Sequence, residues 1–229
     1  MTAPAVNSPH VVVTGASRGI GRELACRYAA DGWRVTVGER RPDAGEPIPA
    51  TERLALDLED PASIEAFAAR IERPVDVLIN NAGVFGPRPQ NLAEVDAAIW
   101  GRLFQVNTIA PVLLARALLE RVAASERRIV ATLTSRMGSL GDNTTGGIPM
   151  YRASKAAVNM AMQCFAHEVA ERGIGVLLVH PGWVRTEMGT AAAELDVATS
   201  VGGVRAVIDA FDAAEKLAFR AWDGRDIPW

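Results

Sequence analysis

The chain has 229 residues, a length that suits one large domain or two small ones, and 49% of them are hydrophobic. Its 24 basic and 27 acidic residues give a net charge of -3 without a basic run, so nucleic acid is not expected as a partner. The first residues show no signal-peptide pattern, and the longest apolar runs, such as 174–179, are too short to cross a bilayer. We therefore expect a soluble, cytoplasmic protein that does not associate with membranes.

The chain begins with an arm, a strand, a glycine-rich turn and a helix. Residues 1–8 show no periodicity and are predicted to form a loose arm. A fully apolar run at 11–13, typical of a parallel strand covered on both faces, leads into TGASRGIG at 14–21. The helical pattern that follows ends at Asp31-Gly32, and residues 34–37 are predicted to form the next strand.

The glycines of this turn indicate a nucleotide site. Gly15 permits a tight turn, while Gly19 and Gly21 let the backbone approach a ligand and the helix pack close to the sheet. The free N–H groups and partial positive charge at the helix N-terminus suit a pyrophosphate. The spacing is G-x-x-x-G-x-G rather than G-x-G-x-x-G, and its position between a strand and a helix favours nucleotide binding.

Strands and helices alternate along the rest of the chain. Further strands are predicted at 54–56, 75–79, 128–133 and 176–179, and helices at 60–71, 95–124 and 150–171, the last closed by Gly173. Pro111 should kink the helix at 95–124 or lie at a tolerated break in it. Residues 134–149 are predicted to form a loop. This alternation predicts a single α/β domain over 1–229 with a three-layer, doubly wound Rossmann fold and a parallel sheet.

Ligands of such sheets bind beyond the carboxyl ends of the strands. The distinctive residues of the sequence fall at these ends: Gly15, Asp57, Asn81, Ser135 and Pro181-Gly182.

Tyr151 and Lys155 stand four residues apart in a predicted helix, and therefore on one helical face. An ammonium beside a phenol lowers the phenol pKa from about 10, so such a tyrosine can exchange a proton near neutral pH. The spacing alone is weak support, because it arises by chance in many helices.

Together these segments resemble the short-chain dehydrogenase/reductase family. The matching motifs, in the family's order, are TGxxxGIG at 14–21, Asp57, NNAG at 80–83, Asn107, Ser135, YxxxK at Tyr151 and Lys155, and PGxxxT at 181–186. Within the family, the segments 135–147, 180–189 and 222–229 are most similar to the C-factor-like group, which shares the long separation of Ser135 from Tyr151. The resemblance implies a mainly parallel sheet of seven strands and an NAD(P)-dependent oxidoreductase that interconverts an alcohol and a carbonyl compound by hydride transfer.

The resemblance also implies roles for the matching residues. Tyr151 acts as the acid in reduction and the base in oxidation, while Lys155 lowers the tyrosine pKa and holds the nicotinamide ribose. Ser135 hydrogen-bonds the substrate oxygen, and Asn107 bends the long helix and joins a water relay. The implied cofactor contacts are Gly15, Ser17, Arg18, Gly19, Ile20, Gly21, Asp57, Leu58, Asn81, Ala82, Gly83, Tyr151, Lys155, Pro181, Gly182, Val184 and Thr186.

Simpler interpretations of two of these residues stay open. Ser135 could be a turn residue, with Thr134 as the neighbouring candidate for its role, and Asn107 could be a local helix-bending side chain.

The choice between NAD and NADP is not resolved by the sequence. Glu39, at the end of the second strand, can accept hydrogen bonds from the ribose hydroxyls and would repel a 2′-phosphate, which favours NAD. Arg18 and Arg40 could bind a 2′-phosphate and favour NADP.

A short substrate lid is expected at 187–200, and a small or medium apolar carbonyl compound is the predicted substrate. The candidate pocket residues are Met137, Ile148, Met150, Trp183 and Met188. The two long helices could pair between subunits of a homo-oligomer. The alternative hypothesis is a nucleotide-binding signalling or regulatory protein of C-factor type with little turnover.

No metal site is predicted, because the three histidines lack ligand spacing. Cys26 and Cys164 fall in apolar helical patterns and are predicted to be buried free thiols.

Overall fold

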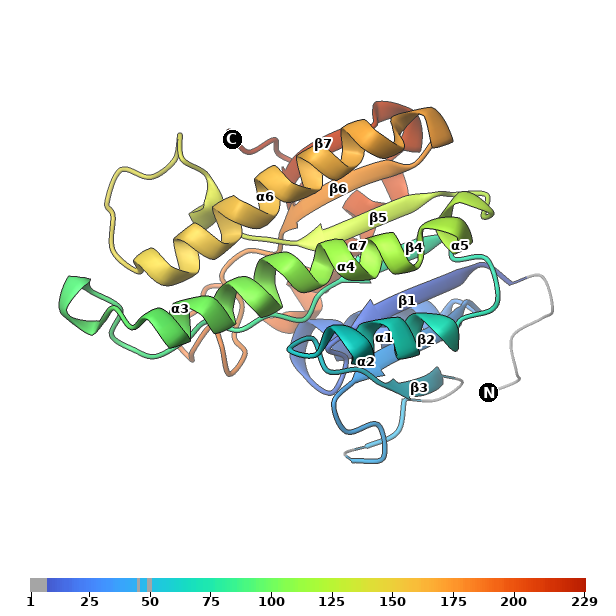
Figure 1. Cartoon of the computed structure of the whole chain (residues 1–229), viewed down its shortest axis with the longest axis horizontal. Coiled ribbons are helices and arrows are strands. Elements are labelled where there is room, and N and C mark those ends of the chain that lie inside the picture. Colours follow the sequence, from blue (N-terminus) through green and yellow to red (C-terminus); the bar gives the residue numbers. More distant parts are fainter. Residues whose placement is uncertain (1–7, 45, 49–50) are drawn as a thin grey trace.

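Seven parallel strands form one sheet in a computed structural model that describes residues 8–44, 46–48 and 51–229 (Figure 1). The strands are β1 His10–Thr14, β2 Arg34–Glu39, β3 Thr51–Ala55, β4 Val77–Asn80, β5 Ile129–Leu133, β6 Gly175–His180 and β7 Leu217–Ala221. They lie in the order β3-β2-β1-β4-β5-β6-β7, and every pairing of the described strands is parallel. The predicted doubly wound, seven-stranded fold is confirmed, and its order reverses between β1 and β4, where such sheets bind ligands.

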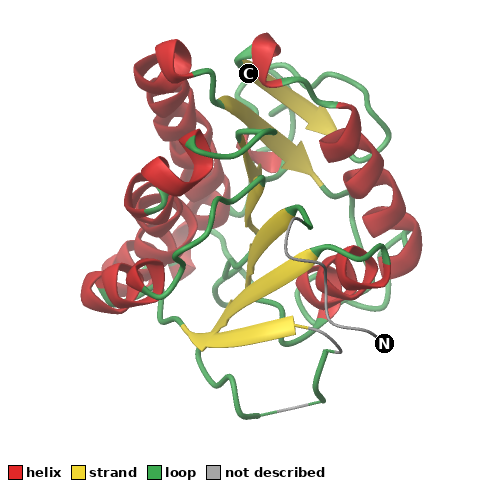
Figure 2. Cartoon of the chain, turned by 90° about the vertical axis from the view of Figure 1, so that its right-hand side faces the viewer, coloured by secondary structure: helices red, strands yellow, loops and turns green. Residues whose placement is uncertain are grey.

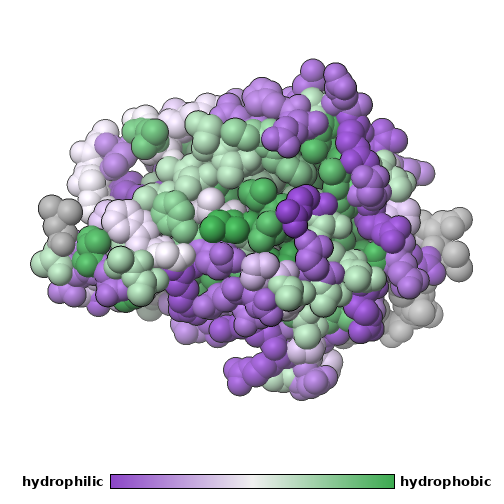
Figure 3. Space-filling view, viewed as in Figure 1, coloured by the Kyte–Doolittle hydropathy of each residue, from purple (hydrophilic) through white to green (hydrophobic). Residues whose placement is uncertain are grey.

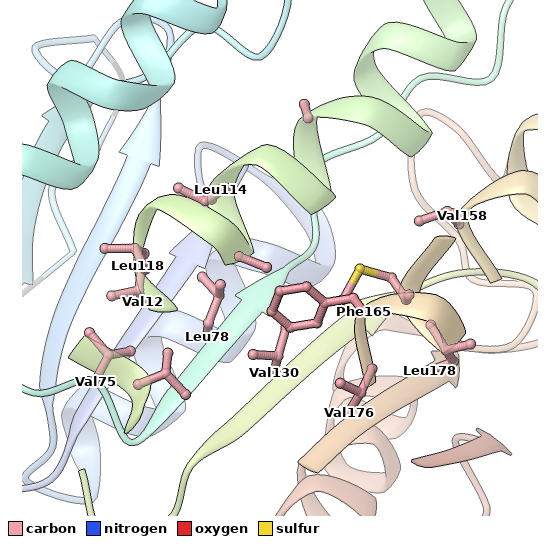
Figure 4. Close-up of a cluster of buried hydrophobic side chains, with 14 of the residues drawn as sticks. Val12, Val75, Leu78, Leu114, Leu118, Val130, Val158, Phe165, Val176 and Leu178 are labelled. Carbon is pink, nitrogen blue, oxygen red and sulfur yellow. The ribbon is translucent and has the colours of Figure 1, made fainter. Parts of the chain in front are cut away.

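Helices cover both faces of the sheet (Figure 2). One face carries α1 Gly19–Ala30 and α7 Val197–Ala210, and the other carries α2 Pro61–Ala69, α3 Ala97–Phe104, α4 Ala110–Ala117, α5 Leu119–Ala123 and α6 Pro149–Val169. The strands are therefore apolar throughout, since successive side chains enter opposite cores. Val12 packs in the cluster of Leu114 and Phe165 (Figure 4), while Val11 and Val13 belong to the cluster beneath α1 and α7.

The helical region predicted at 95–124, with a kink or tolerated break at Pro111, is present and interrupted. It is divided into α3, a π turn at Gln105–Ile109, α4 and α5. Pro111 lies in the first turn of α4, has no N–H to donate and crowds the carbonyl group of Asn107 four residues earlier. The wide π turn accommodates this conflict, so the predicted break exists and has Asn107 inside it.

Three boundaries differ from prediction near the C-terminal half. The helix expected at about 150–171 begins at Pro149 and ends at Val169, and a short 3-10 turn follows it. Gly173, with φ 69°, closes this turn as predicted. The last four residues of the proposed lid, 197–200, form the first turn of α7. Neither α7 nor β7 was identified from the apolar pattern.

The cysteine prediction is wrong for Cys164. This side chain is exposed on α6, and Cys26 on α1 is partly buried. Cys164 lies four residues after the exposed Met160, on the helical face turned away from the sheet.

Residues 1–7 of the predicted N-terminal arm lie outside the described residues. The stretch Ala97–Ala117 is long and apolar enough for a membrane span by composition. Its α4 part buries Ala110, Leu114 and Ala115 in the core against the sheet, as core helices of globular domains do.

Candidate active site

The turn after β1 is closed by contacts that glycine alone permits. Gly15 has φ 70°, and a Cβ there would lie 2.8 Å from the Cβ of Ala82. A Cβ at Gly21 would lie 2.4 Å from Asn81 Nδ2. The Asn81 amide donates to the carbonyl oxygens of Thr14 at 2.8 Å and Gly15 at 3.1 Å. These contacts hold the loop after β4 against the glycine turn.

A cavity of about 750 Å³ runs along the carboxyl ends of the strands, from the glycine turn to Tyr151 and Lys155. The predicted contacts that line it are Gly15, Ser17, Arg18, Gly19, Ile20, Gly21, Glu39, Arg40, Asp57, Leu58, Asn81, Ala82, Gly83, Tyr151, Lys155, Pro181 and Thr186.

Gly182 and Val184 are not among the lining residues, because both pack against Leu195. A Cβ at Gly182 would lie 2.4 Å from Leu195 Cδ1, and Val184 forms an isolated β-bridge with the same residue.

Motif reasoning missed several residues of the cavity wall. Arg102 on α3 lies at the wall with Glu59, to which its Nη2 donates at 2.8 Å. No local spacing could have linked them, since 43 residues separate them in sequence. Leu133 at the end of β5 also lines the cavity.

The phenol of Tyr151 is buried at the inner end of the cavity. Burial raises its pKa to about 12, and a hydrogen bond with the Ser135 side chain opposes that rise in pKa. The Phe85 ring lies against it, with 4.7 Å between ring centroids. At neutral pH Tyr151 is therefore protonated and can act as a proton donor.

Lys155 lies one turn further along α6 and is 5% exposed. Its Nζ donates to the carbonyl oxygen of Leu133 at 3.0 Å, and burial lowers its pKa to about 8. Nζ is 5.8 Å from the centroid of the Tyr151 ring. Burial and the hydrogen bond with Ser135 are the two causes that act on the pKa of the phenol, and the lowering of that pKa by Lys155 stays a prediction.

Asn107 ties the π turn to two other segments of the site. Its Oδ1 accepts from Val84 N at 2.8 Å, and its Nδ2 donates to Val84 O at 2.8 Å and to Ser154 Oγ at 3.0 Å. A Cβ at Gly83 would lie 3.2 Å from Asn107 Oδ1 and 3.7 Å from Lys155 Nζ. The side chain thus joins the NNAG loop to α6 directly beside the lysine.

Ser135 and its neighbour Thr134 have different surroundings. Ser135 Oγ accepts from Met137 N at 3.1 Å and remains within hydrogen-bonding reach of Tyr151. The hydroxyl of Thr134 instead donates to Asn159 Oδ1 at 2.7 Å, beneath α6. The geometry therefore favours Ser135 over Thr134 as the partner of the tyrosine.

Known proteins are similar to this chain in sequence and in architecture. The sequence profile of the short chain dehydrogenase family matches residues 9–196. C-signal of Myxococcus xanthus is 42% identical over 167 residues, covering 72% of this chain and 100% of that protein. The 3-oxoacyl-[acyl-carrier-protein] reductase FabG of Escherichia coli (strain K12) is 33% identical over 192 residues, covering 80% of this chain and 76% of that protein.

Two solved structures show the same fold over nearly the whole chain. The NADPH-bound carbonyl reductase from chicken fatty liver has a TM-score of 0.88 at 30% identity, covering 98% of this chain and 100% of that one. A carbonyl reductase of Pseudomonas aeruginosa PAO1 in complex with NADP has a TM-score of 0.84 at 36% identity, covering 97% and 100%. The chain belongs to the short-chain dehydrogenase/reductase family. Within it, the likeness to C-signal agrees with the predicted C-factor-like subgroup.

This short-chain dehydrogenase/reductase is thus an NAD(P)-dependent oxidoreductase, and its cavity fits such a cofactor. The turn before α1 has no side-chain cap, so its free N–H groups suit a pyrophosphate. At the adenosine end, Glu39 Oε1 is buried without a hydrogen-bond partner among the described residues, and a ribose hydroxyl would supply one.

The other oxygen of Glu39 is held by a residue that sequence analysis did not identify. Arg53 on β3 donates to Glu39 Oε2 from Nε at 2.9 Å and from Nη2 at 2.5 Å. Arg40 lines the same end of the cavity, while Arg18 is paired with Glu187 at 3.0 Å. Arg53 therefore largely neutralises the negative charge of Glu39, the carboxylate expected to repel a 2′-phosphate.

Apolar side chains surround Tyr151 on the side away from the glycine turn. Met137 and Ile148 pack with Tyr151, and Met150 is fully buried in the same cluster. Trp183 is 49% exposed and donates from Nε1 to Gly189 O at 2.6 Å. The five predicted pocket residues thus divide into core, half-buried and surface positions, with Met188 on the cavity wall.

Proposed function

We propose that this enzyme interconverts an alcohol and a carbonyl compound by hydride transfer, with Tyr151 as the general acid and base. The observation that carries this proposal is the position of Tyr151 and Lys155 at the buried end of the cavity, with the Ser135 side chain hydrogen-bonded to Tyr151 although Thr134, and not Ser135, is among the lining residues. The apolar surroundings of Tyr151 support a small or medium apolar carbonyl substrate.

The residues divide the work of carbonyl reduction. NAD(P)H, when bound, supplies the hydride. The Ser135 hydroxyl donates a hydrogen bond to the substrate oxygen as negative charge develops there, and Tyr151 transfers its phenolic proton to that oxygen. The Lys155 ammonium then stabilises the phenolate that remains, and in alcohol oxidation the phenolate takes the proton back.

Replacement of Tyr151 by phenylalanine tests the proposal. Because the hydroxyl carries the proton, we expect Tyr151→Phe to lower kcat on the order of 10²–10⁴-fold while cofactor affinity stays near wild type. Tyr28→Phe is the matched control, since the buried Tyr28 hydroxyl has no hydrogen-bond partner among the described residues and Tyr28 does not line the cavity. A panel of carbonyl compounds with NADH and NADPH provides the assay, and retained turnover in Tyr151→Phe would refute the mechanism.

We further propose NADP(H) as the cofactor. Arg53 compensates the charge of Glu39, and Arg40 is exposed at the wall of the same cavity end. The related carbonyl reductases with bound NADP or NADPH support the same choice.

The cofactor proposal is tested by steady-state kinetics with both nucleotides. We expect wild type to prefer NADPH, and Arg40→Ala to raise KM for NADPH about tenfold with little change for NADH, because a charge-assisted hydrogen bond is lost. Glu39→Ala should raise KM for both cofactors, since both offer a ribose hydroxyl to the free oxygen. A wild-type preference for NADH would contradict the assignment.

The match to C-signal favours a second candidate, a nucleotide-binding regulatory protein with little turnover. That function is supported instead if the protein binds NADPH without turning over any compound of the panel, and if Tyr151→Phe leaves every measured property unchanged.

A further inference from the structure

The N-terminus of α6, which carries Tyr151, lacks a cap from its own sequence. Its N-cap residue, Ile148, has φ 52° and no side-chain capping bond, and Pro149 has no N–H. Two free N–H groups at this end are instead satisfied by Gln90. The Gln90 main-chain oxygen accepts from Ile148 N at 3.1 Å, and its Oε1 accepts from Tyr151 N at 3.2 Å.

The other end of the Gln90 amide fixes the aromatic neighbour of the phenol. Gln90 Nε2 donates to the carbonyl oxygen of Phe85 at 2.6 Å. The Phe85 ring packs on the Tyr151 ring, with their centroids 4.7 Å apart. A Cβ at Gly86, where φ is 88°, would lie 3.2 Å from Gln90 Nε2, so glycine is needed for this close approach.

Gln90 is 6% exposed, and both ends of its amide are engaged although 61 residues separate it from Tyr151. It contacts the tyrosine by two routes, through the backbone N–H and through the ring of Phe85. We propose that Gln90 is a positioning residue for Tyr151: it fixes the height of the helix start and the rotation of the phenol toward the substrate oxygen. This inference rests on the proposed oxidoreductase function.

Two variants separate the contacts. Gln90→Met keeps the length of the side chain and loses the two side-chain hydrogen bonds, to Tyr151 N and to Phe85 O. Gln90→Glu keeps an acceptor for the Tyr151 N–H and loses the donor to Phe85 O. Its negative charge is favourable at a helix N-terminus. The measurements are kcat, KM and NADPH affinity, together with amide hydrogen exchange at Tyr151 and Arg152.

We expect Gln90→Met to lower kcat at least about tenfold with little change in NADPH affinity, because misplacing a reacting group by about 1 Å costs on the order of 10²-fold. Exchange at Tyr151 should become faster than at Arg152, whose N–H donates to Ile148 O within the helix. Gln90→Glu should restore slow exchange at Tyr151 and recover part of kcat.

Asp212→Ala is the matched control. Asp212 caps a short helix just before the amino end of β7, away from the carboxyl ends of the strands, by accepting from Ala214 N at 2.9 Å. Its loss should lower thermal stability and leave kcat unchanged. A folded Gln90→Met protein with wild-type kcat and Tyr151 exchange would overturn the proposal. Absence of turnover in wild type would instead refute the proposed function, while the exchange measurement would still test the cap.

Discussion

At the scale of single residues, burial decides the protonation of the site. Lys155 is one of two lysines in the sequence, and the other, Lys216, is exposed. Burial lowers the pKa of Lys155 to about 8, whereas burial raises the pKa of Tyr151 to about 12. Both shifts favour the neutral forms, which is the expected effect of removing a charge from water.

The lowered lysine pKa predicts a dependence of folding stability on pH. Between about 8 and the usual value of 10.5, the unfolded chain holds a proton at Lys155 that the folded chain has released. Stability of the cofactor-free protein should therefore rise with pH across this window, by on the order of 3 kcal/mol for this group. Urea unfolding at several pH values measures it; Lys155→Met should remove the rise and Lys216→Met should keep it. Identical pH curves for wild type and Lys155→Met would contradict the assignment.

At the scale of elements, the π turn between α3 and α4 connects the loop after β4 to α6. The π turn places Asn107 where its amide reaches both Val84 and Ser154. Ser154 in turn donates to the carbonyl oxygen of Tyr151 at 2.8 Å. The segments that meet at Tyr151 are therefore joined by side-chain amides, Asn107 on one side and Gln90 on the other.

The outer faces of α4 and α6 support association of two copies. Apolar side chains gather over these helices (Figure 3); Ile109, in the π turn just before α4, is 44% exposed, and Met160 on α6 is 60% exposed. We expect the protein to be a dimer or larger in solution, because burying such a face is favourable. Sedimentation should show that Met160→Asp dissociates it, while Leu140→Asp, at an exposed loop residue, does not. A monomeric wild type would contradict this expectation.

At the scale of the whole molecule, the strand order assembles the site. Because every described strand runs the same way, the ends of β1, β2, β4, β5 and β6 meet at one edge. The cavity along this edge combines residues from Gly15 to Val197. Segments that the sequence spreads over most of the chain thus act on one ligand.

The sequence by itself determined the local features: apolar runs that must be covered on both faces, the glycine turn, and the i, i+4 pair of Tyr151 and Lys155. Each depends on backbone geometry over a few residues. It also identified the family, because several such motifs occur in one order.

Only the tertiary structure decided which distant side chains meet. The pairing of Glu39 with Arg53, the cap that Gln90 provides for α6, and the exposure of Cys164 follow from it. So does the burial that raises the pKa of Tyr151. Hydrogen bonds and desolvation depend on distances between atoms, and the packing of the sheet and its helices sets those distances.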